Sequence, residues 1–193
     1  MPPVGQAKNS NEALLHRSWD ALCEAVGNPD HAWNRVVVGS TSEEGSEIRT
    51  AILRRACFES RRLWIHTDSR SPKVGQWQTD PRSAWLFYDH ATRTQLIVKG
   101  LVRIIRSGGD WQRDWDETPS GSRINYQGLQ EPGRPLNPGE EVQPLSQTSG
   151  QENFAVIELT IRSIDRLQLD RRGNRRIRYV HDESGWQAIP VAP

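Results

Sequence analysis

Residues 33–67, WNRVVVGSTSEEGSEIRTAILRRACFESRRLWIHT, predict a run of short antiparallel strands. The stretch holds three segments of strand length that are rich in apolar and β-branched residues, at 33–39, 48–56 and 63–67. Short polar turn signals, at 43–45 and 59–60, separate them. Strands joined by turns this short pair antiparallel, so the stretch is expected to form a three-stranded meander.

Strand and helix signals continue on both sides of this meander. Apolar residues at helical spacing predict a helix from Ser10 or Asn11 to Gly27, after a frayed stretch over residues 1–9. Short helices are expected from Ser71 to about Asp80 and over 110–116. The same reasoning predicts further strands at 84–88, 95–105, 154–161, 167–169, 175–180 and 185–189.

Together these elements predict a mainly β fold, a closed or nearly closed β-barrel with a few small helices. The length of 193 residues fits a single domain over 1–193. Residues 1–31 form its N-terminal helical segment. Residues 106–152 are rich in Gly and Pro and poor in apolar periodicity, so they are expected to form an irregular insertion.

Charge and composition argue against several classes of protein. Lys and Arg total 25 and Asp and Glu total 24, a balance that argues against a nucleic-acid-binding chain. No apolar run reaches the ~18 residues of a membrane span, and no secretory signal is evident, so a cytoplasmic location is expected. The two cysteines form no CxxC motif and the five histidines show no ligand spacing, so no metal site is predicted.

The connection from Thr67 to Lys73 has the features of a phosphate site. A strand ends and a helix begins there, so unpaired N–H groups and the positive end of the helix dipole face outward. Ser71 and Thr67 offer hydroxyl groups, and Lys73 lies in the first turn, where a cation is unfavourable unless an anion shares the site. An ordinary capped helix with an exposed lysine is the alternative, which this stretch alone slightly favours.

Two strands carry further candidates. Arg49 shares a strand face with Ala51 and Leu53, so its guanidinium needs a counter-ion that a ligand phosphate would provide, unless it is a snorkelling edge arginine. Gln95 opens an apolar strand and could bond the edge of a heterocycle, or could be a plain strand-end residue. Six arginines within residues 166–178 form a basic patch that is equally typical of a solvated hairpin.

Taken in order, these segments resemble the pyridoxamine 5′-phosphate oxidase family of FMN-binding split-barrel proteins. Arg49-Thr50-Ala51-Ile52-Leu53-Arg54 is similar to the family's Arg-x-Val-Leu-Leu-Lys strand, and His66-Thr67 and Ser71-Pro72-Lys73 to its Tyr-Thr and Ser-Arg-Lys elements. Residues 95–100 are similar to its Arg-Gln-Val-x-Val-x-Gly strand. The likeness covers roughly residues 32–105 and 153–193.

The resemblance implies an FMN site at the interface of a homodimer. Arg49 and Lys73 would pair with the FMN phosphate, and Gln95 and Arg176 would contact the flavin, Arg176 at its pyrimidine end. The remaining implied FMN contacts are Thr50, Ala51, Ile52, Leu53, Arg54, His66, Thr67, Ser71 and Pro72. Weaker likeness implies substrate contacts at Arg54, Arg123 and Arg172.

The sequence also departs from the family pattern. Pro72 stands where the family has an arginine that binds phosphate, His66 replaces a tyrosine, and Arg54 replaces the lysine that binds substrate phosphate. These changes leave the FMN-binding half of the family's site pattern largely intact and put the half that binds the vitamin B6 substrate in doubt.

The leading hypothesis is therefore an FMN-dependent oxidoreductase in which a small-molecule substrate gives a hydride to flavin N5, with no side chain as nucleophile. The flavin would be reoxidised by dioxygen or another acceptor. The alternatives are a true pyridoxamine or pyridoxine 5′-phosphate oxidase, and a non-catalytic flavin- or haem-binding module.

Overall fold

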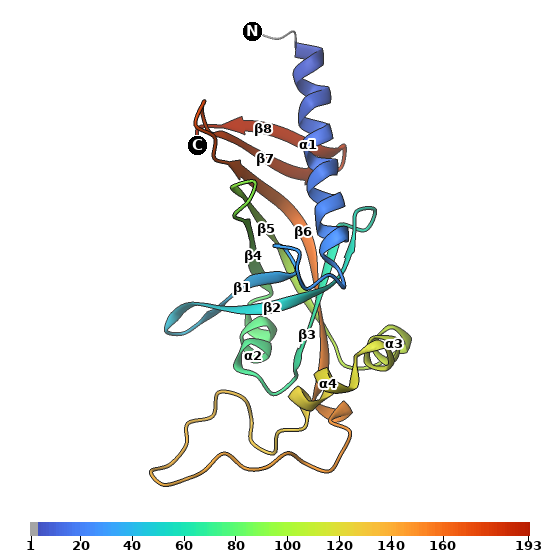
Figure 1. The fold of residues 1–193 in the computed structure, drawn as a ribbon, viewed down its shortest axis with the longest axis vertical. Helices are drawn as coiled ribbons and strands as arrows, with labels where there is room; N and C mark the ends of the chain where they lie inside the picture. Colours follow the sequence, from blue (N-terminus) through green and yellow to red (C-terminus); the bar gives the residue numbers. More distant parts are fainter. Residues whose placement is uncertain (1–3) are drawn as a thin grey trace.

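Two helices precede and interrupt the strands of the N-terminal half in the computed structural model, which describes residues 4–193 (Figure 1). Its elements in this half are α1 (Val4–Ala25), β1 (Arg35–Ser42), β2 (Gly45–Cys57), β3 (Arg62–Asp68), α2 (Pro72–Thr79), β4 (Arg82–Asp89) and β5 (Thr94–Ile105). The C-terminal half contains α3 (Gly109–Glu117), α4 (Ser120–Arg123), two 3-10 turns (Ile124–Tyr126 and Gln151–Asn153), β6 (Phe154–Gln168), β7 (Arg175–Asp182) and β8 (Gly185–Val191).

The strands form one antiparallel sheet that closes on itself. Their order is β3-β2-β1-β4-β5-β6-β7-β8, and β3 also pairs with β6, so the first six strands of this order make a closed barrel. The β7–β8 hairpin continues the sheet beyond the barrel (Figure 1). The expected mainly β barrel, consistent with a split-barrel fold, is thereby confirmed.

The barrel interior forms the main apolar core, and helices add side chains to it. Leu53, Ile65 and Leu96 point inward from the strands, while Trp19 of α1 and Trp77 of α2 join the same buried cluster. In Figure 1, α1 lies beside the β7–β8 end and α2 lies near the opposite end. Because α2 contributes Trp77 to the core, its N-terminal turn is held firmly against the barrel.

Two predicted boundaries were wrong. Helix α1 begins at Val4, so residues 4–9 are helical, and only 1–3 of the stretch expected to be frayed lie outside the described residues. The strands predicted at 154–161 and 167–169 are one strand, β6. Pairing to β5 and β7 carries the chain through its polar middle, and Ile164 there still reaches the core.

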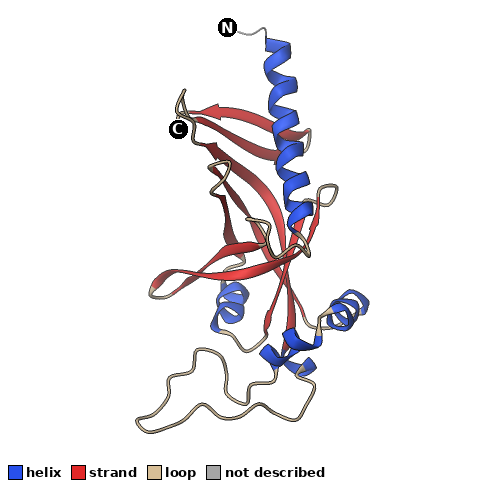
Figure 2. Cartoon of the chain, in the orientation of Figure 1, coloured by secondary structure: helices blue, strands red, loops and turns tan. Residues whose placement is uncertain are grey.

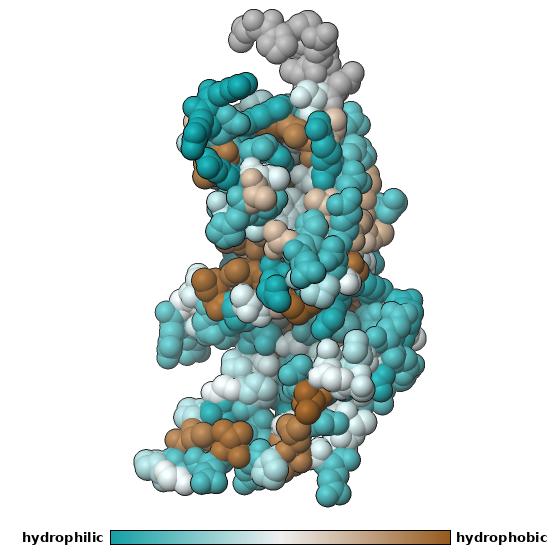
Figure 3. Space-filling view, in the orientation of Figure 1, coloured by the Kyte–Doolittle hydropathy of each residue, from teal (hydrophilic) through white to brown (hydrophobic). Residues whose placement is uncertain are grey.

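Residues 127–150, inside the expected insertion, contain no helix or regular strand (Figure 2). A single isolated bridge joins Gly128 to Leu145, and side-chain bonds from Gln130 to Glu140 close the loop on itself. Apolar side chains are exposed over this part of the molecule (Figure 3), namely those of Ile124, Leu129, Leu136, Val142 and Leu145. The loop also approaches α2, because Gly133 packs beside the ring of Pro72.

Gly100 marks a close approach of β5 and β6 at a β-bulge, and substituting it tests the register. A Cβ at this position would lie 2.0 Å from the carbonyl oxygen of Thr160, a backbone atom that cannot move aside. We expect Gly100→Ala to lower the free energy of unfolding by about 2 kcal/mol, measured by urea denaturation. Gly75→Ala in α2, where nothing lies within 4 Å, is the control and should not destabilise the chain. An unchanged midpoint for Gly100→Ala would contradict the register.

Candidate functional site

The site is built around the short connection between β3 and α2. Thr67 and Ser71 are buried there, yet neither hydroxyl makes a side-chain hydrogen bond with any residue in 4–193. Ser71 occupies the N-cap position as predicted, but the Val74 N–H that its side chain would cap bonds the Ser71 carbonyl instead, at 2.9 Å. Both hydroxyls therefore remain available to a ligand.

Lys73, in the first turn of α2, lacks a protein partner. Across the described chain its ammonium makes no hydrogen bond and no ion pair, although the residue is partly buried. Burial lowers the pKa of Lys73, and the nearby Arg49 lowers it further, against a weaker opposing effect of Asp68. A desolvated cation beside a second cation is unfavourable, so the arrangement favours an anion between them.

Arg49 reaches the same face of α2 from β2. Its guanidinium donates to the Gln76 side chain at 3.3 Å, and Gln76 lies one helical turn beyond Lys73. Part of the counter-charge that Arg49 is expected to need comes from the chain itself, because Glu47 pairs with it at 2.8 Å. The Glu47 side chain is 44% exposed, so this pair is weak and leaves Arg49 able to bind a stronger anion.

Glu47, Gln76 and Ser40 are the site residues that the sequence reasoning missed. The side chain of Gln76 links Glu47 to Ser40 and Arg49. Its amide nitrogen donates to Glu47 at 2.7 Å, while its carbonyl oxygen accepts from Ser40 and Arg49. Strand alternation places Glu47 and Arg49 on one face, which is the signal that could have identified the pair.

Arg54 and His66 lie beyond the cluster around Arg49, on the outer side of β2 and β3. The His66 side chain is only 8% exposed, and its Nε2 atom has no hydrogen-bond partner among the described residues, while Asp114 of α3 lies 3.8 Å away. Burial lowers the pKa of His66 and outweighs the opposing effect of Asp114. The Nε atom of Arg54 is likewise buried without a partner. Buried polar groups without partners are uncommon in folded proteins, and a bound ligand is one way to supply the missing partner.

Arg123, a predicted substrate contact, is occupied by its own neighbourhood. Its guanidinium donates to the backbone carbonyls of Trp115, Asp116 and Thr118 and stacks 4.8 Å from the Trp115 ring. It thus closes the C-terminal end of α3, where cations are favourable.

Gln95, Arg172 and Arg176 lie far from this cluster. Gln95 pairs with Leu167 of β6, and Leu167 pairs with Arg176 of β7. Gln95, Leu167 and Arg176 therefore form one row across the sheet. Thr67 pairs with Ala155 near the other end of β6. Twelve residues of strand separate Ala155 from Leu167, roughly 40 Å along the chain. Arg176 is paired with Asp165 at 2.9 Å, and Arg172 lies in the β6–β7 connection.

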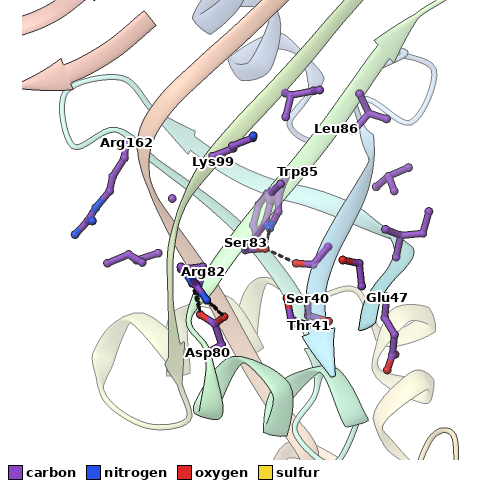
Figure 4. A pocket seen from close by; sticks show the side chains of 18 residues that line it. Ser40, Thr41, Glu47, Asp80, Arg82, Ser83, Trp85, Leu86, Lys99 and Arg162 are labelled. Atoms are coloured by element: carbon purple, nitrogen blue, oxygen red, sulfur yellow. Dashed lines mark hydrogen bonds and ion pairs between the residues drawn. The ribbon is translucent and has the colours of Figure 1, made fainter. Parts of the chain in front are cut away.

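A cavity of about 680 Å³ lies on the outer face of β1, β4 and β5 (Figure 4). Val37, Trp85, Leu86 and Ile97 contribute an apolar floor. The charged side chains around it include Glu47, Arg82, Lys99 and Arg162. None of the predicted cofactor residues lines this cavity, but it borders the Arg49 cluster through Ser40 and Glu47.

Residues 4–193 contain neither a metal-binding cluster nor a membrane-spanning helix. No group of three or more His, Cys, Asp or Glu side chains is placed to hold a metal ion. No helix in this part of the chain is long and apolar enough to cross a membrane.

Comparison with known proteins supports the expected family. Residues 17–106 match the sequence profile described as "Pyridoxamine 5'-phosphate oxidase, FMN-binding domain". No curated protein sequence matches the chain. The resemblance to the pyridoxamine 5′-phosphate oxidase-like FMN-binding family is confirmed by this profile over residues 17–106, and the solved structures share the fold over most of the chain.

Three solved structures illustrate the shared fold. A pyridoxamine 5′-phosphate oxidase-related, FMN-binding protein from Nostoc punctiforme is 23% identical, with a TM-score of 0.72 over 94% of this chain and 96% of that one. PhzG from Burkholderia lata, in complex with tetrahydrophenazine-1-carboxylic acid, is 14% identical, with a TM-score of 0.70 over 94% and 92%. A protein from Clostridium acetobutylicum related to general stress protein 26 is 15% identical, with a TM-score of 0.53 over 86% and 94%.

Proposed function

We propose that the chain is an FMN-dependent oxidoreductase that takes a hydride from a small-molecule substrate. The observation that carries this proposal is the half-buried, unpartnered ammonium of Lys73 beside Arg49, at the start of α2. Two cations with two free hydroxyl groups next to them match the charge and the acceptor oxygens of a phosphate monoester. The family profile, which is that of an FMN-binding domain, supports the same ligand.

The residues present fit FMN in a definite division of labour. Arg49 and Lys73 would hold the phosphate, with Thr67 and Ser71 donating to it. The β2 backbone from Thr50 to Leu53, followed by Arg54 and His66, would lie along the flavin. Pro72 stands where the family pattern has an arginine that binds phosphate, but its ring fixes the first turn of α2.

The bound FMN would supply the redox chemistry by accepting a hydride at N5. The chain's own residues would bind the cofactor and orient it. His66, neutral because burial lowers its pKa, offers a hydrogen-bonding nitrogen without adding a second buried charge beside Arg54. Asp114 of α3 and Thr118, which follows α3, lie beside that ring, at 3.8 Å from its Nε2 atom and 3.5 Å from its Nδ1 atom.

We also propose a homodimer, which the distribution of the predicted contacts supports. Gln95 and Arg176 lie at the opposite end of β6 from Thr67 and cannot reach the same cofactor within one chain. Two copies that face each other would let Gln95 and Arg176 of one copy complete the site of the other. The apolar cavity over β1, β4 and β5 is the surface we propose for that contact.

The narrower function, oxidation of pyridoxamine 5′-phosphate itself, has less support. Arg123, the one candidate left in the insertion for binding its phosphate, is engaged by three carbonyls of α3. Hydrogen peroxide release with pyridoxamine or pyridoxine 5′-phosphate would establish it.

The visible spectrum of the purified protein tests the cofactor. We expect flavin absorption bands, and we expect Arg49→Gln with Lys73→Gln to weaken FMN binding about a hundredfold or more, because two charge-assisted contacts are lost. Fluorescence quenching of added FMN gives the affinity. Arg35→Gln with Arg113→Gln removes equal charge away from the Arg49 cluster and from the proposed dimer surface, and should keep FMN. A wild-type protein that is colourless and takes up no FMN would refute the cofactor.

Mixing variants tests the shared site. A chain with Arg49→Gln and Lys73→Gln and a chain with Gln95→Ala and Arg176→Gln should each bind FMN poorly. Unfolded together and refolded, they should regain up to one intact site in each mixed dimer, and fluorescence titration should detect it. Recovery no greater than the sum of the two separate variants would contradict a site built from both copies.

A further inference from the structure

A second polar cavity lies at the other end of the molecule, between α1 and the barrel. It measures about 180 Å³ and is bounded by α1, the segment after it, the β4–β5 turn and the end of β6. Figure 1 shows α1 alongside this end of the sheet. At ~30 Å³ per water molecule, the cavity has room for about six waters or a small ion.

Two arginines of the cavity lack acidic partners. Arg166 lies on the core-facing side of β6, in line with Ile164, and its one side-chain bond is to the amide oxygen of Gln168 at 3.0 Å. Arg17 of α1 makes only a 3.4 Å bond to the Ala13 carbonyl. Neither forms an ion pair with any carboxylate in residues 4–193. Burial lowers the pKa of Arg166, and the neighbouring cations Arg175 and Arg17 lower it further, against the opposing effect of Tyr179.

The neutral groups of the cavity also offer donors. The Nδ1 atom of His31 accepts the Trp33 backbone N–H at 3.1 Å, so the proton of the neutral ring resides on Nε2. The Thr92 hydroxyl gives its single proton to Asp89, so the 2.9 Å contact between Thr92 and Thr94 uses the Thr94 proton and leaves that hydroxyl without a free donor. The Gln168 amide nitrogen makes no hydrogen bond with the described residues.

The single carboxylate of the cavity is already satisfied. Both oxygens of Asp89 accept hydrogen bonds within the β4–β5 turn, one from the Ala91 N–H at 2.8 Å and the other from the Thr92 hydroxyl at 2.6 Å. The donors that remain therefore greatly outnumber the free acceptors. A ligand rich in acceptor oxygens and negative in charge is the complement of such a surface.

We infer that this cavity binds a small oxyanion, held by Arg166 and Arg17 and bridging α1 to β6. The inference does not depend on the cofactor. Gln95 and Arg176, the flavin contacts proposed at this end of the chain, belong to the opposite face of the sheet from Arg166, because Leu167 pairs with both of them.

Isothermal titration calorimetry of the full chain, with FMN added to fill the Arg49 cluster, tests this site. Inorganic phosphate is the first probe and malonate the second, which distinguishes phosphate from dicarboxylate recognition. One of them should bind with one ion per chain and raise the melting temperature. Arg166→Gln should weaken that binding about tenfold or more. Arg17→Gln, on an exposed helix position, gives a second variant that does not disturb the core and should weaken it similarly.

The matched control is Arg171→Gln, which removes the same charge from the β6–β7 connection outside this cavity and should leave anion binding unchanged. Lys73→Gln should also leave it unchanged. Absence of binding by both anions at millimolar concentration would overturn the inference. So would binding that is lost in Lys73→Gln and retained in Arg166→Gln, which would assign the anion to the cofactor site instead.

Discussion

A desolvated ammonium that has no partner among the described residues, held next to a guanidinium, is the constraint around which this protein is organised. Lys73 cannot move away from Arg49 easily, because Trp77 anchors α2 in the core and Gln76 ties Arg49 to the same helix. Within residues 4–193, this repulsion is offset only by the weak Glu47 pair and by the charge of Asp68. A phosphate group would relieve it fully, so the fold holds the site ready for an anion before one binds.

Because the closed barrel fixes the connection between β3 and α2, few residues are needed to form the site. Pairing of β3 with β6 closes the sheet and fixes where β3 ends, which in turn fixes the connection that carries Thr67 and Ser71. The same long β6 separates that connection from Gln95 and Arg176. One strand thus both positions the β3–α2 connection and separates the proposed cofactor contacts along its length. The α3 segment adds Asp114 behind His66, which extends the site into the insertion.

Local features of the fold and site could be predicted from the sequence, whereas long-range ones could not. Ser71, Pro72 and Lys73 are consecutive, so their joint position followed from one helix start signal. Arg49 faces inward because strand alternation requires it. Its bonds to Gln76 depend on how the β1–β2 hairpin meets α2, twenty-seven residues further along the chain, and no local pattern encodes that contact. Likewise, β6 remains one strand through polar residues because both its neighbours pair with it.

The most direct measurement is to compare the affinity of the purified chain for FMN and for riboflavin, which has the same ring system and ribityl chain but no phosphate. If Lys73 and Arg49 bind the phosphate, FMN should bind about a hundredfold or more tightly than riboflavin, and the ratio should collapse when both cations are removed. Equal affinities for the two flavins, or a ratio unaffected by loss of both side chains, would contradict the account.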